Sequence, residues 1–339
     1  MTTESAAPST ARIVRFHELG SADVLKLEEL PLPEPGPGEV RLRVQAFGLN
    51  RAEVVFRQGR YFAQPIFPSH IGYEASGVVE AVGAGVDAGL VGQKRSTVPC
   101  FAVDKYGVYG EVAIVPAYAL AAYPERLTAE EATSIWMQYL TAYGALVQHG
   151  HVGAGDFVVI SAASSSVGLA AIEIVKAEGG VSIATTRTAA KKAELLALGA
   201  DHVVVTDEED FVARVAEITG GKGARLIFDP VAGPWVEKLA QAAAHGGVIY
   251  LYGALGGVAT PFPLVLGMRK SLTIRGYLLG DVVSDTSKRA VAEKYVFDKL
   301  ERGEFKPRIA KTFALEDVVA AHKYLESNEQ VGKVVVTVP

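Results

Sequence analysis

The sequence predicts an α/β protein with two domains, an antiparallel barrel-like domain and a doubly wound parallel sheet. In the first third of the chain, short apolar segments alternate with glycine and proline turns, which is typical of antiparallel strands. From residue 155 onward, branched apolar runs alternate with helix-like segments, as a parallel sheet with crossover helices requires. The length of 339 residues is sufficient for two such cores.

The first domain is predicted from its strands and from one helix start. The alternation of apolar and polar residues in Val40–Ala46 is the pattern of a half-buried strand. Thr128 and Glu131 form a capping-box pattern, which predicts a helix start ahead of an apolar segment that runs to Val147. The predicted strands are Arg12–Phe16, Leu25–Leu30, Val40–Ala46, Glu74–Val82 and Gly110–Val115.

The second domain is predicted from six strands rich in branched residues, which suit a sheet buried on both faces. These strands are Phe157–Ile160, Val181–Thr185, His202–Val205, Leu226–Asp229, Val248–Leu251 and Leu272–Arg275. The intervening helices are expected up to Glu178 and over Lys191–Leu198, Glu209–Thr219 and Trp235–Ala244. After Arg289 we expect a long helix, a helix over Glu316–Ser327 and a last strand, Lys333–Val338, which rejoins the first domain. The expected domains are therefore 11–133 with 289–339, and 134–288.

Composition narrows the class of protein. The net charge of −5 gives no support for binding nucleic acid. The single cysteine, Cys100, excludes an internal disulfide framework and a multi-thiolate metal site, and it fits a reducing cytoplasm. Residues 1–10 are small and polar, so we expect a disordered tail rather than a signal peptide. No apolar run approaches the roughly 20 residues of a membrane helix, so no membrane association is expected.

The segment Asp156–Ala171, DFVVISAASSSVGLAA, resembles a dinucleotide-binding fingerprint that lacks two of its three glycines. Small residues between a strand and a helix start let backbone N–H groups and the helix dipole face an anion. Ala163, Ser165 and Gly168 occupy the positions of the three glycines in G-x-G-x-x-G. The other expected cofactor contacts in this turn are Ser164, Ser166 and Val167.

The same turn half matches the nucleophile elbow of a hydrolase. Ser164 to Gly168 reads S-S-S-V-G against the pattern G-x-S-x-G, and Asp229 and His245 follow in a suitable order. The pattern is weak because Ser164 replaces its first glycine, and the Cβ atom would crowd the strained turn. Of the two interpretations we favour the dinucleotide turn.

The chain resembles the medium-chain dehydrogenase/reductase superfamily, in its zinc-free quinone oxidoreductase (zeta-crystallin-like) branch. The resemblance implies a GroES-like barrel domain and a Rossmann domain, with the cofactor in the cleft between them. It covers nearly the whole chain and rests on motifs in the family's order: GLNRAE (48–53), RQGRY (57–61), FPSHIGYEASGVVEAVG (67–83), WMQYLTAYGAL (136–146), AASSSVGLAA (162–171), LGADHVV (198–204) and VGKVVVTV (331–338).

The residues after the second parallel strand indicate which cofactor binds. NAD-binding folds usually hold a carboxylate there, whereas this chain has Thr186 and Arg187, followed by Lys191. A guanidinium, an ammonium and nearby hydroxyl groups suit a 2′-phosphate, so we predict NADPH rather than NADH. The alternative is that Arg187 and Lys191 are solvated charges at a helix start.

Three more cofactor contacts are expected. The resemblance places Thr141 facing the cofactor and Lys333 near its phosphates; the alternatives are a packing residue and a solvated charge at a strand edge. Gly253 follows the fifth strand, where a missing Cβ lets the backbone approach the nicotinamide, unless it only forms a turn.

Asn50 and Tyr73 stand where zinc-dependent relatives have ligands, and the four-cysteine lobe is absent, so no metal is expected. His70, Glu74 and Cys100 could be imagined as ligands, but their spacing is not that of a known site. The resemblance places Asn50, Tyr61 and Tyr73 near the nicotinamide or substrate as hydrogen-bond donors. Alternatively, Tyr61 only lines the cleft and Tyr73 only fills the space of the lost ligand.

The expected function is hydride transfer from NADPH to a quinone or an α,β-unsaturated carbonyl compound, without zinc. The alternatives are a zinc alcohol dehydrogenase and a non-catalytic NADPH-binding protein of the zeta-crystallin type. The apolar loops 261–268 and 277–283 argue for a non-polar small substrate. The resemblance also implies a homodimer, with Leu272–Arg275 as the edge strand.

Overall fold

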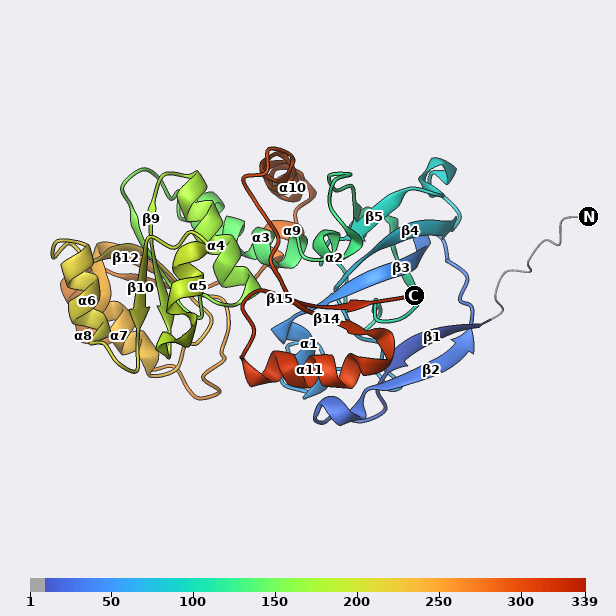
Figure 1. Ribbon diagram of the computed structural model, residues 1–339, viewed down its shortest axis with the longest axis horizontal. Helices are drawn as coiled ribbons and strands as arrows, with labels where there is room; N and C mark the ends of the chain where they lie inside the picture. The colour runs from blue at the N-terminus through green and yellow to red at the C-terminus, as the bar shows by residue number, and fades with distance from the viewer. Residues whose placement is uncertain (1–9) are drawn as a thin grey trace, which may run out of the picture. The chain divides into compact units, whose positions relative to one another are not determined.

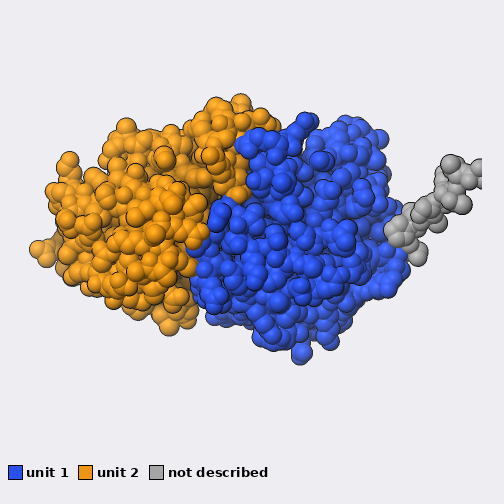
Figure 2. Space-filling model, viewed as in Figure 1, with its two compact units in different colours: residues 1–137, 308–339 blue, residues 138–307 orange. Residues whose placement is uncertain are grey.

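The computed structural model describes residues 10–339, and these form two compact units (Figure 2). Unit 1 comprises the chain up to Met137 together with Arg308–Pro339, and unit 2 comprises Gln138–Pro307. Residues 289–307 were expected with the first domain and instead belong to unit 2. The disordered tail expected at residues 1–10 lies outside the described residues up to residue 9, and Thr10 already begins the first strand.

Unit 1 is built from a two-stranded antiparallel sheet and a larger curved sheet. The strands of the small sheet are β1 (Thr10–Arg15) and β2 (Lys26–Pro31). The large sheet has the order β14-β15-β3-β4-β5-β7, and β6 also pairs with β3; its pairs are antiparallel except β14 with β15. Its strands are β3 (Glu39–Leu49), β4 (Glu74–Val82), β5 (Lys94–Thr97), β6 (Val112–Pro116), β7 (Leu120–Ala121), β14 (Ile309–Ala314) and β15 (Lys333–Thr337).

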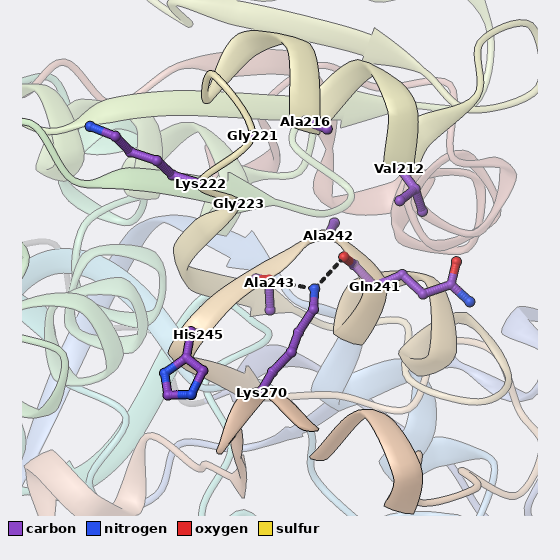
Figure 3. A pocket seen from close by; sticks show the side chains of 10 residues that line it. All are labelled: Val212, Ala216, Gly221, Lys222, Gly223, Gln241, Ala242, Ala243, His245 and Lys270. Carbon is purple, nitrogen blue, oxygen red and sulfur yellow. Dashed lines mark hydrogen bonds between the residues drawn. The ribbon is translucent and has the colours of Figure 1, made fainter. Parts of the chain in front are cut away.

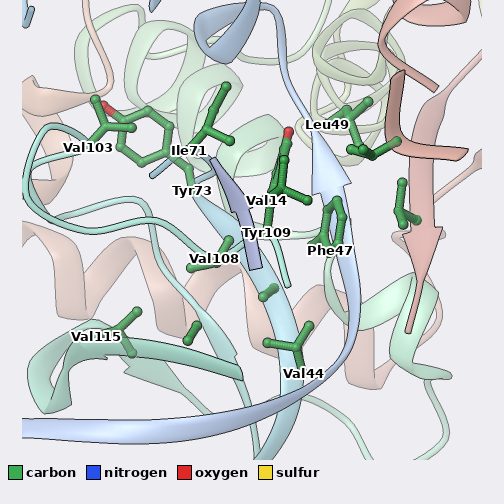
Figure 4. Close-up of a cluster of buried hydrophobic side chains, with 14 of the residues drawn as sticks. Val14, Val44, Phe47, Leu49, Ile71, Tyr73, Val103, Val108, Tyr109 and Val115 are labelled. Atoms are coloured by element: carbon green, nitrogen blue, oxygen red, sulfur yellow. The ribbon is translucent and has the colours of Figure 1, made fainter. Parts of the chain in front are cut away.

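The core of unit 1 lies among these strands and the helix α11 (Figure 4). Val40, Leu42 and Val44 of β3 are buried in it at every second residue, as the period-2 pattern predicted. An irregularity in the register between Val44 and Ala46 then shifts the alternation, so that Phe47 and Leu49 continue the buried face. Phe47 stacks on Tyr109 with ring centroids 4.2 Å apart. The helical segments of unit 1 are η1 (Ala22–Val24), α1 (Arg51–Arg57), η2 (Ala88–Leu90), η3 (Ala117–Ala119), α2 (Ala129–Ala132), η6 (Leu315–Asp317) and α11 (Val318–Ser327).

The predicted helix start at Thr128 is confirmed, but the helix does not continue to Val147. Thr128 accepts from the backbone N–H of Glu131, and the Glu131 side chain accepts from the backbone N–H of Thr128. α2 then ends at Ala132. The segment restarts as α3 (Trp136–Tyr143) and becomes the π-helix η4 (Gly144–His149).

Unit 2 contains the predicted six-stranded parallel sheet, with the order β10-β9-β8-β11-β12-β13. Two halves run outward from β8 and β11, so the strand order reverses between these two strands. This is the strand order of a dinucleotide-binding Rossmann sheet. The strands are β8 (Phe157–Ile160), β9 (Val181–Thr186), β10 (His202–Val205), β11 (Ala224–Asp229), β12 (Ala243–Leu251) and β13 (Thr273–Gly276).

Helices cover both faces of this sheet, α4 and α5 on one side and α6, α7 and α8 on the other (Figure 1). Residues 243 and 244, expected at the end of a helix, instead begin β12. The long helix expected from Arg289 begins earlier, after the N-cap Asp285. The helical segments are α4 (Ser166–Ala177), η5 (Ala189–Lys191), α5 (Lys192–Ala197), α6 (Phe211–Ile218), α7 (Trp235–Ala242), α8 (Leu264–Lys270), α9 (Gly280–Val283) and α10 (Thr286–Glu301). Within residues 10–339, no helix combines the length and apolar character that spanning a membrane requires.

Candidate active site

The first group of expected site residues lies where β3 ends and α1 begins. Asn50 is the N-cap of α1 and is 7% exposed. Its backbone N–H donates to Glu53 Oε2 at 2.6 Å, which is the return half of a capping box. Its Nδ2 donates to Glu53 Oε1 at 3.1 Å. The local sequence Asn-Arg-Ala-Glu therefore holds both the backbone and the side chain of Asn50.

A buried lysine near the C-terminus of the chain contacts the same junction of β3 and α1. Lys333, the first residue of β15, donates from Nζ to Asn50 Oδ1 at 2.6 Å and forms an ion pair with Glu74. We call Asn50, Glu53, Tyr73, Glu74 and Lys333 the Lys333 cluster. Lys333 was expected near cofactor phosphates or at a solvated strand edge. The structure instead places it 1% exposed, with its ammonium held inside unit 1.

Of the two tyrosines expected at the site, Tyr73 belongs to this cluster and Tyr61 lies beside it. The backbone N–H of Tyr73 donates to Glu53 Oε1 at 3.1 Å. The hydroxyl groups of Tyr61 and Tyr73 are 3.4 Å apart, longer than a strong O–H···O hydrogen bond. Burial raises the pKa of both phenols, so both are neutral at physiological pH. A neutral phenol can donate a hydrogen bond, which is the chemistry expected of these residues.

Glu53 makes the stability of unit 1 depend on pH. The side chain is fully buried, and this burial raises its pKa from 4.5 to about 7, although the nearby Lys333 opposes the shift. Between pH 4.5 and 7 the folded carboxyl therefore binds a proton that the unfolded one has released. Stability that depends on this group must fall as the pH rises through that window.

We expect Glu53→Gln to remove this pH dependence. The free energy of unfolding of the wild type, relative to the variant, should decrease from pH 5 to pH 8. Denaturant titrations at several pH values measure the difference, and Glu329→Gln, an exposed carboxyl in the same unit, is the matched control. Parallel curves for wild type and Glu53→Gln would contradict the assignment.

The side chains considered as metal ligands do not form a cluster. Among residues 10–339, no three His, Cys, Asp or Glu side chains are grouped so that they could hold a metal ion. Glu74 is engaged on both oxygens, since Oε1 accepts from the backbone N–H of Met137 at 2.8 Å and Oε2 pairs with Lys333.

In unit 2, the fingerprint turn joins β8 to α4. The Ser165 hydroxyl caps α4 by accepting from the Gly168 N–H at 3.0 Å. A Cβ atom on Gly168 would lie 2.6 Å from the Cα of Ala163, so this glycine lets the helix pack on the turn. The N–H groups of Ala163 and Ser165 donate to Thr185 and Ala162 carbonyls. Their amides are thus turned inward, contrary to the simplest expectation of a phosphate-facing loop.

The amides of Ser166 and Val167 occupy the first turn of α4, where a helix cannot satisfy its own N–H groups. A 12-residue helix with such a start attracts an anion. Lys191 lies next to this start, because its Nζ donates to Ser164 Oγ at 3.1 Å. The structure therefore brings together a serine and a lysine that are 27 residues apart, and both suit a phosphate.

The other predicted cofactor residues of unit 2 are placed separately. Thr186 ends β9, and its hydroxyl donates to the Thr188 carbonyl at 3.3 Å. Arg187 follows it and is exposed. Thr141 is buried within α3. A Cβ atom on Gly253 would lie 2.8 Å from the carbonyl oxygen of Pro230, so this glycine is already required by packing within unit 2.

The hydrolase alternative is wrong, because its three residues do not meet. The serines follow the carboxyl end of β8, whereas His245 lies near the start of the parallel strand β12, at the opposite edge of the sheet. Asp229 is also occupied, since its Oδ2 accepts from the N–H groups of Val231 and Ala232 at 3.0 and 2.6 Å.

His245 instead lines a hollow of about 260 Å³ at that opposite edge (Figure 3). Lys270 dominates this hollow, but its ammonium donates to the carbonyls of Ala240, Gln241 and Ala243 at 3.2, 2.6 and 2.7 Å. These carbonyls end α7 and begin β12, so the charge satisfies a helix C-terminus.

The role of Glu53 and the partners of Lys333 were not predicted from the sequence. The Glu53 role had a readable signal, because Asn50 and Glu53 have capping-box spacing ahead of an apolar segment. The Lys333 contact had none, since its partners Asn50 and Glu74 are 283 and 259 residues away in the sequence.

Comparison with known proteins agrees with both units. Residues 36–125 match the family described as alcohol dehydrogenase GroES-like domain, and residues 166–294 match the family described as zinc-binding dehydrogenase. A "2-haloacrylate reductase" of Burkholderia sp is 32% identical over 328 residues, which cover 94% of this chain and 97% of that protein.

Two solved structures are similar over nearly the whole chain. One is the Escherichia coli quinone oxidoreductase complexed with NADPH, with 29% identity, a TM-score of 0.89 and coverage of 96% of this chain and 100% of that one. The other is described as an NAD-dependent alcohol dehydrogenase, with 32% identity, a TM-score of 0.87 and coverage of 97% and 100%. The fold, the order of the motifs and these relatives agree, and the chain belongs to the medium-chain dehydrogenase/reductase superfamily, in its quinone oxidoreductase branch.

Proposed function

We propose that this protein transfers a hydride from NADPH to a quinone or an α,β-unsaturated carbonyl compound, without a zinc ion. The two substrate classes correspond to relatives named quinone oxidoreductase and 2-haloacrylate reductase. We also propose that it acts in the cytoplasm, because a single cysteine suits a reducing compartment.

The observation that carries the cofactor proposal is the basic end of β9. The chain has Thr186 and Arg187 where an NAD-binding fold has a carboxylate, and Lys191 bonds to Ser164 in the fingerprint turn. Together with the start of α4, this donor set fits the phosphates of NADPH. In this proposal Ser164, Ser166 and Val167 bind the pyrophosphate, and Arg187 and Lys191 bind the 2′-phosphate.

The bound cofactor supplies the hydride from its nicotinamide ring. In the enone reaction, this hydride bonds to the β-carbon, the π electrons move to the carbonyl oxygen, and a solvent proton completes the saturated product. The protein has to stabilise the negative charge that develops on that oxygen. Asn50 has a second Nδ2 hydrogen besides the one given to Glu53, and the phenols of Tyr61 and Tyr73 are further neutral donors.

We propose zinc independence because of the charge beside Glu74. The Lys333 ammonium already pairs with this carboxylate, and a second cation there would be repelled. Asn50 stands at a position where zinc-dependent relatives have a ligand. Its Oδ1 accepts a hydrogen bond from the same ammonium.

The test is the oxidation of NADPH, followed by its absorbance, with a panel of naphthoquinone, cyclohexenone and 2-chloroacrylate. We expect turnover with at least one acceptor and no loss of rate after treatment with a metal chelator. Turnover of none of these acceptors, together with tight NADPH binding, would favour the non-catalytic alternative. Stoichiometric zinc with NAD-dependent oxidation of alcohols would favour the alcohol dehydrogenase alternative.

We further propose a homodimer joined through the edge of the unit 2 sheet. Within the described chain, β13 is the last strand of its sheet and pairs with β12. Exposed apolar side chains lie in α8 and in the segment just before it, which precede β13 in the chain. The exposed fractions are 62% for Phe262, 61% for Val265 and 66% for Met268. Such a patch is typical of an interaction surface.

Light scattering should therefore give a particle of twice the 35.8 kDa chain mass. Val265→Lys should shift the particle towards the monomer, because it places a charge in an apolar interface. Val91→Lys, at an exposed valine of unit 1, is the matched control. A monomeric wild type at high protein concentration would rule the dimer out.

A further inference from the structure

A fully enclosed ammonium group lies in unit 1 near the end of β3. Lys333 is among the largest buried side chains, and its Nζ contacts Asn50 Oδ1 and Glu74 Oε2. Lysine is almost never fully buried unless it is paired. The fold makes room for this one, because a Cβ atom on Gly48 would lie 2.6 Å from Lys333 Cε and 2.5 Å from the Thr133 carbonyl oxygen.

Stability alone is a poor reason for this arrangement. A buried ion pair loses the hydration of both charges, and apolar residues of similar size often replace such a pair without loss of stability. The best-attested use of buried polar groups, shown in some proteins, is to select one arrangement among several. The group that Lys333 and Glu74 can select here is the side chain of Asn50.

An asparagine amide is nearly symmetric in shape, so its donor and acceptor ends can exchange by a half-turn. Lys333 has only donors and therefore requires the Asn50 oxygen. Glu53 accepts from Asn50 Nδ2 at 3.1 Å. In the flipped amide, the NH₂ group would meet the ammonium and the oxygen would meet the carboxylate. Both contacts would be repulsive.

Glu53 cannot enforce this orientation by itself near neutral pH. Burial raises its pKa to about 7, and a protonated carboxyl can donate as well as accept. The ammonium of Lys333 has no acceptor in any case. Lys333, which has donors only, is thus the partner that specifies the Asn50 orientation.

We propose that Lys333 is a positioning residue, whose ammonium, held by Glu74, fixes the Asn50 amide with its NH₂ group available as the hydrogen-bond donor to the substrate oxygen. This inference rests on the proposed function for its kinetic consequence. The orientation of Asn50 itself does not depend on which substrate is reduced.

The kinetic test uses the double variant Lys333→Met with Glu74→Gln. Lys333→Met alone leaves a buried carboxylate unpaired and is expected to unfold at a lower temperature. The double variant carries neither charge, so it should unfold within a few degrees of the wild type and keep its KM for NADPH. We expect its kcat to fall roughly 10- to 100-fold, because the donor is no longer held in place. Lys311→Met, at an exposed lysine of unit 1, should keep the wild-type kcat.

Two kinetic signatures separate positioning from a purely structural role. The ratio of the double variant's kcat to the wild-type kcat should decrease from pH 8 to pH 6. In the double variant only Glu53 orients Asn50, and Glu53 becomes protonated as the pH falls through about 7, so that it no longer distinguishes the two ends of the amide. In an Asn50→Ala background, the two substitutions should cause no further loss of kcat. Recovery of the wild-type kcat by the stable double variant would overturn the proposal.

An NMR measurement tests whether Lys333 fixes the Asn50 amide without requiring catalytic turnover. The side-chain amide signal of Asn50, assigned by its loss in Asn50→Ala, should show one slowly exchanging environment in the wild type. In the double variant it should broaden or exchange faster. Two interconverting environments in the wild type would overturn the proposal. Failure to reduce any quinone or enone, with a single wild-type amide environment, would reject the proposed substrates and retain the role of Lys333.

Discussion

Replacing Asn50 with alanine is expected to lower kcat for the quinone or enone by roughly 10²- to 10³-fold, with a much smaller change in the KM for NADPH. This is the usual loss when one donor to a developing oxyanion is removed. The effect should fall on kcat because the donor is needed most when the oxygen carries negative charge. Steady-state rates with saturating NADPH measure it.

A second substitution at Asn50 separates the donor from the rest of the cluster. Asn50→Asp keeps an oxygen for Lys333 but has no NH₂ group, so its kcat should also fall. Asn328→Gly is the matched control, because Asn328 ends α11 in the left-handed region with φ 60°, which glycine also adopts. A kcat within threefold of the wild type in both Asn50 variants would remove Asn50 from the mechanism.

The combined change of Arg187 and Lys191 to alanine is expected to raise the KM for NADPH roughly 100-fold and to leave the KM for NADH nearly unchanged. Only NADPH carries the 2′-phosphate. We expect each of the two charged hydrogen bonds to contribute about a factor of ten to the KM for NADPH. This is less than such a bond contributes in a buried site, because Arg187 is exposed and solvent screens its charge.

The measurement is the ratio of kcat/KM for the two cofactors in the wild type, in each single variant and in the double variant. Lys192→Ala is the matched control, since the neighbouring Lys192 pairs with Glu209 at 3.3 Å. An unchanged preference in the double variant would assign cofactor choice to other residues. A wild-type preference for NADH would contradict the cofactor proposal itself.

The parallel sheet of unit 2 was predicted well because its signal is local. Strands such as Val181–Thr186 are short runs of branched and small residues between turns, and their alternation with helices leaves few possible topologies. Their ends were less accurate. β12 begins at Ala243 rather than Val248, since the pairing of Ala224 with Ala243 across the sheet extends it.

In the segment from Thr128 to Val147, the helix start could be predicted from nearby residues, but the break in the helix could not. The capping box set the start of α2, because both partners lie within one turn. The break at Thr133–Ile135 depends on tertiary contacts. Trp136, the first residue of α3, is buried and donates from Nε1 to Ser96 Oγ at 2.8 Å, 40 residues away.

The sequence by itself determined the family, the two-domain α/β architecture, the fingerprint turn and the basic residues after β9, since each depends on neighbours along the chain. Only the tertiary structure decided which groups Lys333 contacts. Its burial, the space left by Gly48 and the contacts with Asn50 and Glu74 follow from the pairing of β15 with β3 and of β3 with β4. A lysine has the same sequence signature at a solvated edge and in a core, and the difference lies in the charges that the fold places around it.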